Sequence, residues 1–358
     1  MAVEHGGNML SLAREFGFRT EDCLDFSANI NPLGLSERAR ECILQNLDAI
    51  LHYPDVNYRT ARSYLAAYHG VNEEQILLSN GAVELFYDLA RQIKPPKVLL
   101  LSPTFMEYER AFSLEGTTFF YHVLKGPEFR WSLESIKSDL ALLSAGDMVL
   151  ICNPNNPTGS LVTGLELKKL AQLLQQRNIG LIVDEAFVDF TKNEATYTLI
   201  SYLKDLPNAI VVRSLTKFYA LPGLRLGYLV TKNEQLIRGI EGFKPPWTVN
   251  ALSDALVPVI LEDKAYKDAT FSWLKAEQKF LYSGLKELSE LDVTVPSANY
   301  IFFEYKGEID LRAALRQKKI FIRSCSNYHH LTDKYYRIAI RNRTENQRLL
   351  KVLKELLV

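Results

Sequence analysis

Residues 214–228 read SLTKFYALPGLRLGY and place one lysine, Lys217, next to hydroxyl-bearing residues. Eight positions later, Arg225 stands inside a Gly-Leu-Arg-Leu-Gly turn. Ser214, Thr216 and Arg225 could together bind a phosphate, with the guanidinium as a forked donor. A lysine that forms an imine needs a site that lowers its pKa and holds a carbonyl partner. A surface lysine in an ordinary strand-loop-strand is the alternative for Lys217 alone, but the whole pattern favours a phosphorylated carbonyl cofactor.

Apolar strands and helical segments alternate on the N-terminal side of this stretch. Strands are expected at 76–79, 98–102, 118–123, 148–152, 180–183, 209–213 and 226–230, and helices at 82–93, 105–115, 132–143, 163–177 and 197–204. Continuous apolar strands such as MVLIC and GLIVD indicate a sheet covered on both faces. We therefore predict an α/β fold whose large domain has a mainly parallel sheet. Ligands bind at the carboxyl ends of such strands, where the loops NGAVE, NPNNPTG, DEAF and SLTK fall.

The remaining segments predict an N-terminal arm and a smaller domain. A short helix is expected at 9–17, a helix capped by Ser36 and running to about 51, and another at 58–69. After residue 245 we expect a long helical stretch at 250–289, strands at 293–304, 319–324 and 335–341, and helices at 309–317 and 344–357. The predicted division is an arm at 1–35 that packs with the small domain, a large domain at 36–245, and a small α+β domain at 246–358.

Composition excludes several classes of function. Among 358 residues, 42 Lys plus Arg balance 42 Asp plus Glu, so no basic surface suggests nucleic acid. The first residues carry no secretory signal, and no apolar run approaches the roughly 20 residues of a membrane span. The four cysteines are far apart, which fits free thiols in a reducing cytoplasm. Adjacent His329 and His330 cannot act as paired ligands on one helix face, and we expect no metal site.

Three further motifs carry candidate chemistry, each with a plainer alternative. Asp184 ends an apolar strand, where a carboxylate needs a partner such as a pyridinium N–H, although a helix N-cap is as common. Asn156 lies in a turn rich in proline, and making that turn is its alternative role. Gly81-Ala82-Val83 opens a helix after a strand and could bind an anion, although every strand-to-helix connection needs a turn.

Together these motifs resemble the class I and II aminotransferases, a family of fold type I enzymes that use pyridoxal 5′-phosphate (PLP). The resemblance implies that Lys217 carries PLP, that Asp184 pairs with its ring nitrogen and that Asn156 donates to its phenolic oxygen. It places the PLP phosphate at Gly81, Ala82, Val83, Ser214, Thr216 and Arg225. Tyr108 would stack on the ring, and Tyr53 would reach the phosphate of the neighbouring subunit, which implies a homodimer. Phe187 departs from the tyrosine that many relatives have at the fourth position of DEAF, so one donor to the phenolic oxygen is lost.

The substrate is suggested by a closer resemblance that extends along the chain. HGGN at 5–8, DFSANINPLG at 25–34, IRSCSNY at 322–328 and YYRIAIR at 335–341 resemble the L-threonine-O-3-phosphate decarboxylases of cobalamin biosynthesis. The implied reaction converts L-threonine O-3-phosphate into (R)-1-amino-2-propanol O-2-phosphate and CO2. The substrate's carboxylate and phosphate would be shared among His5, Asn29, Asn156, Arg323 and Arg337.

The assignment of each anion stays open, and so does the origin of His5 in the same or the other subunit. Each of these residues also has a plainer alternative. HGGN could be a flexible terminus, and Arg337 could lie at the surface on an edge strand. Arg323 could form an ordinary ion pair with a nearby acid. Histidinol-phosphate aminotransferase is the alternative enzyme, with the same cofactor residues. A cofactor-bound regulator without activity is a third possibility, disfavoured by the complete set of cofactor residues.

Overall fold

The structure is a computed structural model that describes residues 6–357. Its larger sheet has seven strands in the order β2-β8-β7-β6-β5-β3-β4, and β8 alone runs antiparallel to its neighbours. This confirms the α/β fold with a mainly parallel sheet. The strands are β2 (Ile76–Ser79), β3 (Lys97–Ser102), β4 (Thr118–Val123), β5 (Met148–Cys152), β6 (Gly180–Asp184), β7 (Ala209–Ser214) and β8 (Gly227–Thr231).

Both faces of this sheet are buried, because successive side chains of a strand point to opposite faces. On one face, Leu77, Val98 and Leu229 pack with α4 (Ala82–Ile93), α5 (Glu107–Ser113) and α9 (Glu234–Glu241). On the other, Leu78 and Leu99 join a larger core that reaches the C-terminal part of the chain. Helix α7 (Gly164–Gln175) belongs to this larger core, and shorter elements are α6 (Lys137–Leu140), α8 (Glu194–Tyr197) and the 3₁₀ turns at Glu73–Gln75, Val188–Phe190 and Ile200–Asp205.

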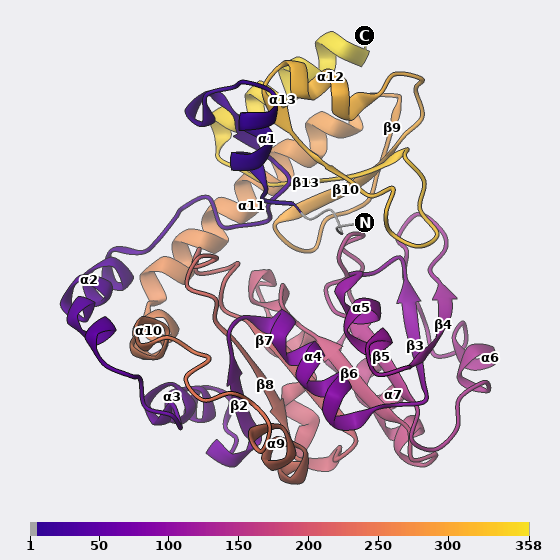
Figure 1. Ribbon diagram of the computed structural model, residues 1–358. Helices are drawn as coiled ribbons and strands as arrows, with labels where there is room; N and C mark the ends of the chain where they lie inside the picture. Colours follow the sequence, from indigo (N-terminus) through magenta and orange to yellow (C-terminus); the bar gives the residue numbers. More distant parts are fainter. Residues whose placement is uncertain (1–5, 358) are drawn as a thin grey trace.

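A smaller sheet lies above the large one in Figure 1, beside the long helix α11 (Lys264–Lys286). Its antiparallel strands follow the order β12-β13-β10-β9. Their bounds are β9 (Leu291–Val293), β10 (Tyr300–Tyr305), β12 (Arg323–Ser324) and β13 (Tyr335–Ala339), with α12 (Leu311–Gln317) and α13 (Arg343–Leu357) alongside. The arm, with α1 (Met9–Glu15) and a 3₁₀ turn at Thr20–Asp22, joins this region, since β1 (Leu24–Asp25) pairs with β11 (Ile320–Phe321).

Helix α10 (Ala251–Glu262) packs instead against α2 (Glu37–Gln45) and α3 (Arg59–His69). Packing therefore crosses residue 246, and the three-part division stays a prediction. The expected helix to residue 51 ends at Gln45, because the Asn46 side chain binds the carbonyl of Cys42 and a 3₁₀ turn, Leu47–Leu51, follows.

Several expected elements are shorter or divided. The helical stretch 250–289 is broken at Asp263, whose side chain accepts from the Tyr266 N–H and caps a new helix. The expected strand 293–304 is two strands, separated by a loop that contains Pro296. Residues 319–324 form two short strands in different sheets. Residues 197–204 form part of α8 and a 3₁₀ turn instead of a helix, and α9 was not expected at all.

Candidate active site

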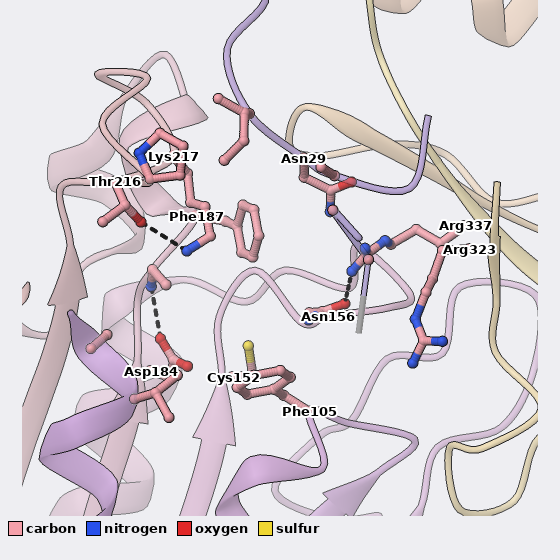
Figure 2. Close-up of a pocket in the computed structure, with 18 of the residues that line it drawn as sticks. Asn29, Phe105, Cys152, Asn156, Asp184, Phe187, Thr216, Lys217, Arg323 and Arg337 are labelled. Carbon is pink, nitrogen blue, oxygen red and sulfur yellow. Dashed lines mark hydrogen bonds between the residues drawn. The ribbon is translucent and has the colours of Figure 1, made fainter. Parts of the chain in front are cut away.

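A cavity of about 420 Å³ lies where the carboxyl ends of β5 and β6 meet the small sheet and the arm. This is a volume typical of small-molecule sites. It brings together most of the side chains singled out from the sequence, namely Asn29, Ala82, Val83, Tyr108, Asn156, Asp184, Thr216, Lys217, Arg225, Arg323 and Arg337. Figure 2 shows Lys217 and Asp184 on one side of the cavity and the two arginines on the other.

Lys217 is enclosed at the end of the loop that follows β7. Its Nζ donates to Thr216 Oγ1 at 2.9 Å, and that oxygen lies 2.8 Å from Ser214 Oγ. Enclosure by protein lowers the pKa of Lys217 to about 8, helped by the charges of Arg225 and Arg337 and opposed by Asp184. A substantial fraction of the amine is therefore neutral near pH 7.5, as a lysine that attacks a carbonyl requires.

Asp184 ends β6 and is almost completely buried. Its Oδ1 accepts from the backbone N–H of Ala186 at 2.8 Å, and its Oδ2 accepts from the Tyr108 hydroxyl at 2.5 Å. Burial raises the pKa of Asp184, whereas the two hydrogen bonds favour the ionised form. A buried carboxylate is thus held ready for a cationic partner in the cavity.

Two interpretations of Tyr108 follow from the sequence, a stacking residue by family resemblance and a core tyrosine on an amphipathic helix, and the stacking role conflicts with this geometry. Tyr108 has no exposed surface, and its hydroxyl is committed to Asp184. Phe105 packs edge-on against it at 5.5 Å between ring centroids, is only half-buried and presents its ring in the cavity (Figure 2). The assignment is therefore corrected: Phe105 offers the aromatic surface, and Tyr108 supports Asp184.

An anion cradle forms where the start of α4 meets Arg225. Gly81 precedes α4 with φ of +85°, and no side chain caps the helix there. A Cβ at Gly81 would lie 2.5 Å from Arg225 Nη2, so only glycine allows the guanidinium to come this close. Helix N-terminal N–H groups and a guanidinium together favour a phosphate. Gly81 and Ser214 support this cradle from just outside the cavity lining.

At the opposite end, Arg323 and Arg337 are direct cross-strand partners on β12 and β13, and both are buried. Arg337 donates to Asn156 Oδ1 and, at 2.8 Å, to the carbonyl of Ser27. Among residues 6–357, no carboxylate forms an ion pair with Arg337. A buried guanidinium without a carboxylate partner among these residues favours an anion in the cavity beside Arg337.

Asn29 and Asn156 complete this end of the cavity. Neither the oxygen nor the nitrogen of the buried Asn29 side chain has a hydrogen-bond partner among the described residues. Because an unsatisfied buried amide is costly, it indicates a position at which a polar ligand group binds. Asn156 Oδ1 accepts from Arg337 and lies 3.4 Å from the Tyr328 hydroxyl, which leaves the amide nitrogen of Asn156 as a donor.

His5 and Tyr53 are the two remaining residues that the sequence predicted for the site. His5 falls outside the described residues, but Gly6 and Gly7 of the same motif line the cavity, and Gly7 N–H donates to Ser27 Oγ at 2.9 Å. Tyr53 is 80% exposed and stacks on Trp247 at 4.4 Å between ring centroids. It contributes nothing to the cavity of its own chain.

A buried ionic cluster behind the cavity was not foreseen. Arg213 has no exposed surface and meets Glu185, Asp189 and Glu194 at 2.9, 3.1 and 2.5 Å. Arg213 precedes Ser214, and Glu185 follows Asp184. Side chains alternate along a strand, so Arg213 and Glu185 point away from the site that their neighbours Ser214 and Asp184 serve. The cluster therefore supports these two strand ends from behind the cavity. The available signal in the sequence was the charge of the four cluster residues, which lie in the segments DEAFVDF, NEA and VRS.

The match to the family model for aminotransferase class I and II extends over residues 21–353, and the chain belongs to this family. It is 40% identical to the threonine-phosphate decarboxylase of Salmonella typhimurium, across 99% of this chain and 96% of that protein. The adenosylcobalamin biosynthesis bifunctional protein CobDQ of Leptospira interrogans is 32% identical over 97% of this chain, which covers 40% of that longer protein. The crystal structure of the histidinol-phosphate aminotransferase from Clostridium acetobutylicum superimposes with a TM-score of 0.86 at 29% identity, covering 93% of this chain and 98% of that one.

PLP is the cofactor that this family implies, and the cavity fits it. Lys217 supplies an amine with a lowered pKa, Asp184 a buried carboxylate, Phe105 an aromatic surface, and α4 with Arg225 an anion cradle. These groups surround one cavity of ligand size. Their chemistry matches the amine, ring nitrogen, ring face and phosphate contacts that PLP requires.

Proposed function

We propose that this chain decarboxylates L-threonine O-3-phosphate to (R)-1-amino-2-propanol O-2-phosphate with PLP as cofactor, as a step of cobalamin biosynthesis. The observation that carries the substrate class is the buried pair Arg323 and Arg337, aligned across β12 and β13 in the cavity of Lys217. Two cations with an unpartnered Asn29 amide suit a substrate with two anionic groups. Identity to the Salmonella enzyme supports a phosphate and a carboxylate as those groups.

PLP, when bound, withdraws electrons from the substrate Cα through its protonated ring. The protein's part is to choose the bond that breaks. Arg323, Arg337 and Asn29 can hold the two anions so that the bond from Cα to the carboxylate stands perpendicular to the ring plane. A fixed orientation of this kind lowers the barrier without any covalent role for the arginines.

Proton transfer falls to Lys217 and charge balance to Asp184. With a pKa of about 8, the Lys217 Nζ can give a proton to Cα after CO2 leaves and take one up again near neutral pH. The Tyr108 hydroxyl and the Ala186 N–H donate to Asp184 and favour its ionised form. Delivery of the proton to Cα completes the loss of CO2 and avoids transamination.

The oligomer and location form part of the same proposal. Exposed apolar side chains cluster on one segment with Trp247, namely Leu44, Leu47, Ile50, Leu51, Tyr53 and Val56. A patch of this size suits a second copy of the chain, and Tyr53 would then reach the neighbour's cofactor phosphate. Within residues 6–357, no helix is long and apolar enough to cross a membrane. Four buried free thiols fit the cytoplasm.

The test supplies the PLP-loaded protein with L-threonine O-3-phosphate, without any oxo acid, and follows CO2 release. We expect CO2 and repeated turnover, no release from L-threonine lacking the phosphate, and a loss of kcat/KM of about 100-fold in Arg323→Gln and Arg337→Gln. Conversion of histidinol phosphate only in the presence of 2-oxoglutarate, with no CO2, would instead establish the aminotransferase.

A further inference from the structure

Four consecutive residues after β12 join the substrate end of the cavity to the large sheet. Asn327 and Tyr328 face Arg323: Arg323 Nη2 donates to Asn327 Oδ1 at 2.8 Å, and its guanidinium lies 5.4 Å from the centre of the Tyr328 ring. The next two residues, His329 and His330, contact the large-sheet region, at Glu109 and Ser102 respectively. Any movement of this turn therefore moves Arg323 as well.

His329 and His330 make side-chain contacts with two elements of the large sheet region. His329 Nε2 lies 2.6 Å from Glu109 Oε2 on α5, and His330 Nδ1 lies 2.9 Å from Ser102 Oγ at the end of β3. Both imidazoles also pack on the ring of Tyr121, with centroids 5.1 and 5.6 Å away. We call these four polar residues, Ser102, Glu109, His329 and His330, the clasp.

The hydrogen bonds of Ser102 fix one tautomer of His330. Ser102 Oγ also donates to the carbonyl of His329 at 3.0 Å. A hydroxyl has one proton and a carbonyl can only accept, so His330 Nδ1 must carry the proton and donate to Ser102. His330 adopts φ of +65°, a left-handed conformation that few non-glycine residues adopt without surrounding support. The backbone of the turn is therefore strained at His330, the residue that contacts Ser102.

The clasp also joins the two halves of the cavity. Ser102 lies three residues before Phe105, and Glu109 directly follows Tyr108. On the other side, only Cys325 and Ser326 separate the turn from β12, which carries Arg323. The clasp consequently fixes the distance between the aromatic and acidic groups at the cofactor end and the arginine at the substrate end.

We infer that His329 and His330 are positioning residues, which set substrate affinity by holding the Asn327–Tyr328 turn and Arg323 in place through Glu109 and Ser102. The inference rests on the proposed function, because Arg323 is taken to bind an anion of the substrate. Neither histidine belongs to the cavity lining, so the effect must pass through the turn.

The test uses the PLP-loaded enzyme with the variants His329→Gln, Glu109→Gln, their combination, and Ser102→Ala with His329→Gln. We expect each single variant to raise KM for L-threonine O-3-phosphate about threefold to fivefold with kcat nearly unchanged, in line with the loss of one half-exposed hydrogen bond. The combination His329→Gln with Glu109→Gln should be no worse than either alone, because both break one contact. Ser102→Ala with His329→Gln should raise KM about tenfold.

A second readout separates this inference from the proposed reaction. Inorganic phosphate that binds beside Arg323 should stabilise the PLP-loaded protein by mass action, so its dissociation constant can be obtained from the rise in melting temperature. That constant should increase by the same factors as KM, even if threonine phosphate proves not to be the substrate. His122→Gln is the matched control, since it breaks a similar contact, 2.7 Å to Asp139, elsewhere on β4.

Two outcomes overturn the inference. In the first, His329→Gln and Glu109→Gln leave both KM and the phosphate dissociation constant within twofold of wild type. In the second, His122→Gln raises both constants as much as His329→Gln does, which would reveal a general loss of stability in place of positioning.

Discussion

The hydrogen bond from Tyr108 to Asp184 gives a direct measure of how the cofactor end works. Tyr108→Phe removes a 2.5 Å bond to a buried carboxylate and leaves the ring packing in place. A hydrogen bond to a charged group contributes about 1.5–3 kcal/mol, and one pK unit corresponds to about 1.4 kcal/mol. The pKa of Asp184, which burial already raises, should therefore rise by about one to two further units.

The sign of the pH effect follows from the role of Asp184. The Tyr108 bond lowers the pKa of Asp184, so its loss makes the ionised form disappear at a higher pH than in the wild type. Cofactor binding that depends on the ionised carboxylate should weaken by roughly 10- to 150-fold, and most strongly on the acidic side of neutrality. The dissociation constant of PLP, measured by absorbance from pH 6 to pH 9, tests both the size and the direction.

The same chain offers a control of matched chemistry. Tyr87 donates to Glu107 Oε2 at 3.0 Å, in a tyrosine–carboxylate bond that does not face the cavity. Tyr87→Phe should bind PLP as the wild type does. The reasoning fails if Tyr108→Phe keeps wild-type PLP affinity at every pH, or if Tyr87→Phe shows the same loss.

Three other predictions address the lysine, the ionic cluster and the second subunit. PLP attachment to the apoprotein should accelerate tenfold per pH unit and level off above about pH 8, where Lys217 is neutral; acceleration that continues to pH 10 would contradict the lowered pKa. Arg213→Met should cost about 3–5 kcal/mol in the free energy of unfolding, because three carboxylates lose their cation. Adding Glu185→Leu should recover part of that loss, and an unchanged denaturant midpoint in the single variant would refute the role of the cluster. Tyr53→Phe keeps the ring on Trp247 and removes one hydroxyl, so PLP binding should weaken about threefold to tenfold while sedimentation is unchanged; wild-type affinity would argue against contact with the neighbour's phosphate.

The strands of the large sheet could be predicted because strands that are buried on both faces consist of continuous apolar residues. The helix at 132–143 could not be predicted correctly, since the side chains of Ser132 and Ser135 bind each other's backbone N–H groups and compete with helical bonds. Only the four residues Lys137–Leu140 become α-helical. Local polar bonds of this kind leave no periodic signal.

At the site, motifs with short spacing were predictable, but contacts between distant segments were not. Lys217 and Arg225 belong to one stretch, and the structure places both in the cavity. Phe105 and Tyr108 are two aromatics three residues apart, and only the packing of α5 decides which one faces the cavity and which one binds Asp184. The alignment of Arg323 with Arg337 depends on strand register, which the sequence leaves undetermined when both strands are short.

The alternation of side chains along strands links the site to the framework behind it. Asp184 faces the cavity, and Glu185, the next residue, faces Arg213; on the neighbouring strand Arg213 faces the cluster and Ser214 faces the cradle. A shift of β6 by one residue would put Glu185 in the cavity and Asp184 in the cluster, and a shift of β7 by one residue would exchange Arg213 with Ser214. The ionic cluster resists such a shift, since a displaced Arg213 would leave three carboxylates in a protein interior without their cation. The buried charges that contribute nothing to binding therefore help to specify the register on which the cofactor contacts depend.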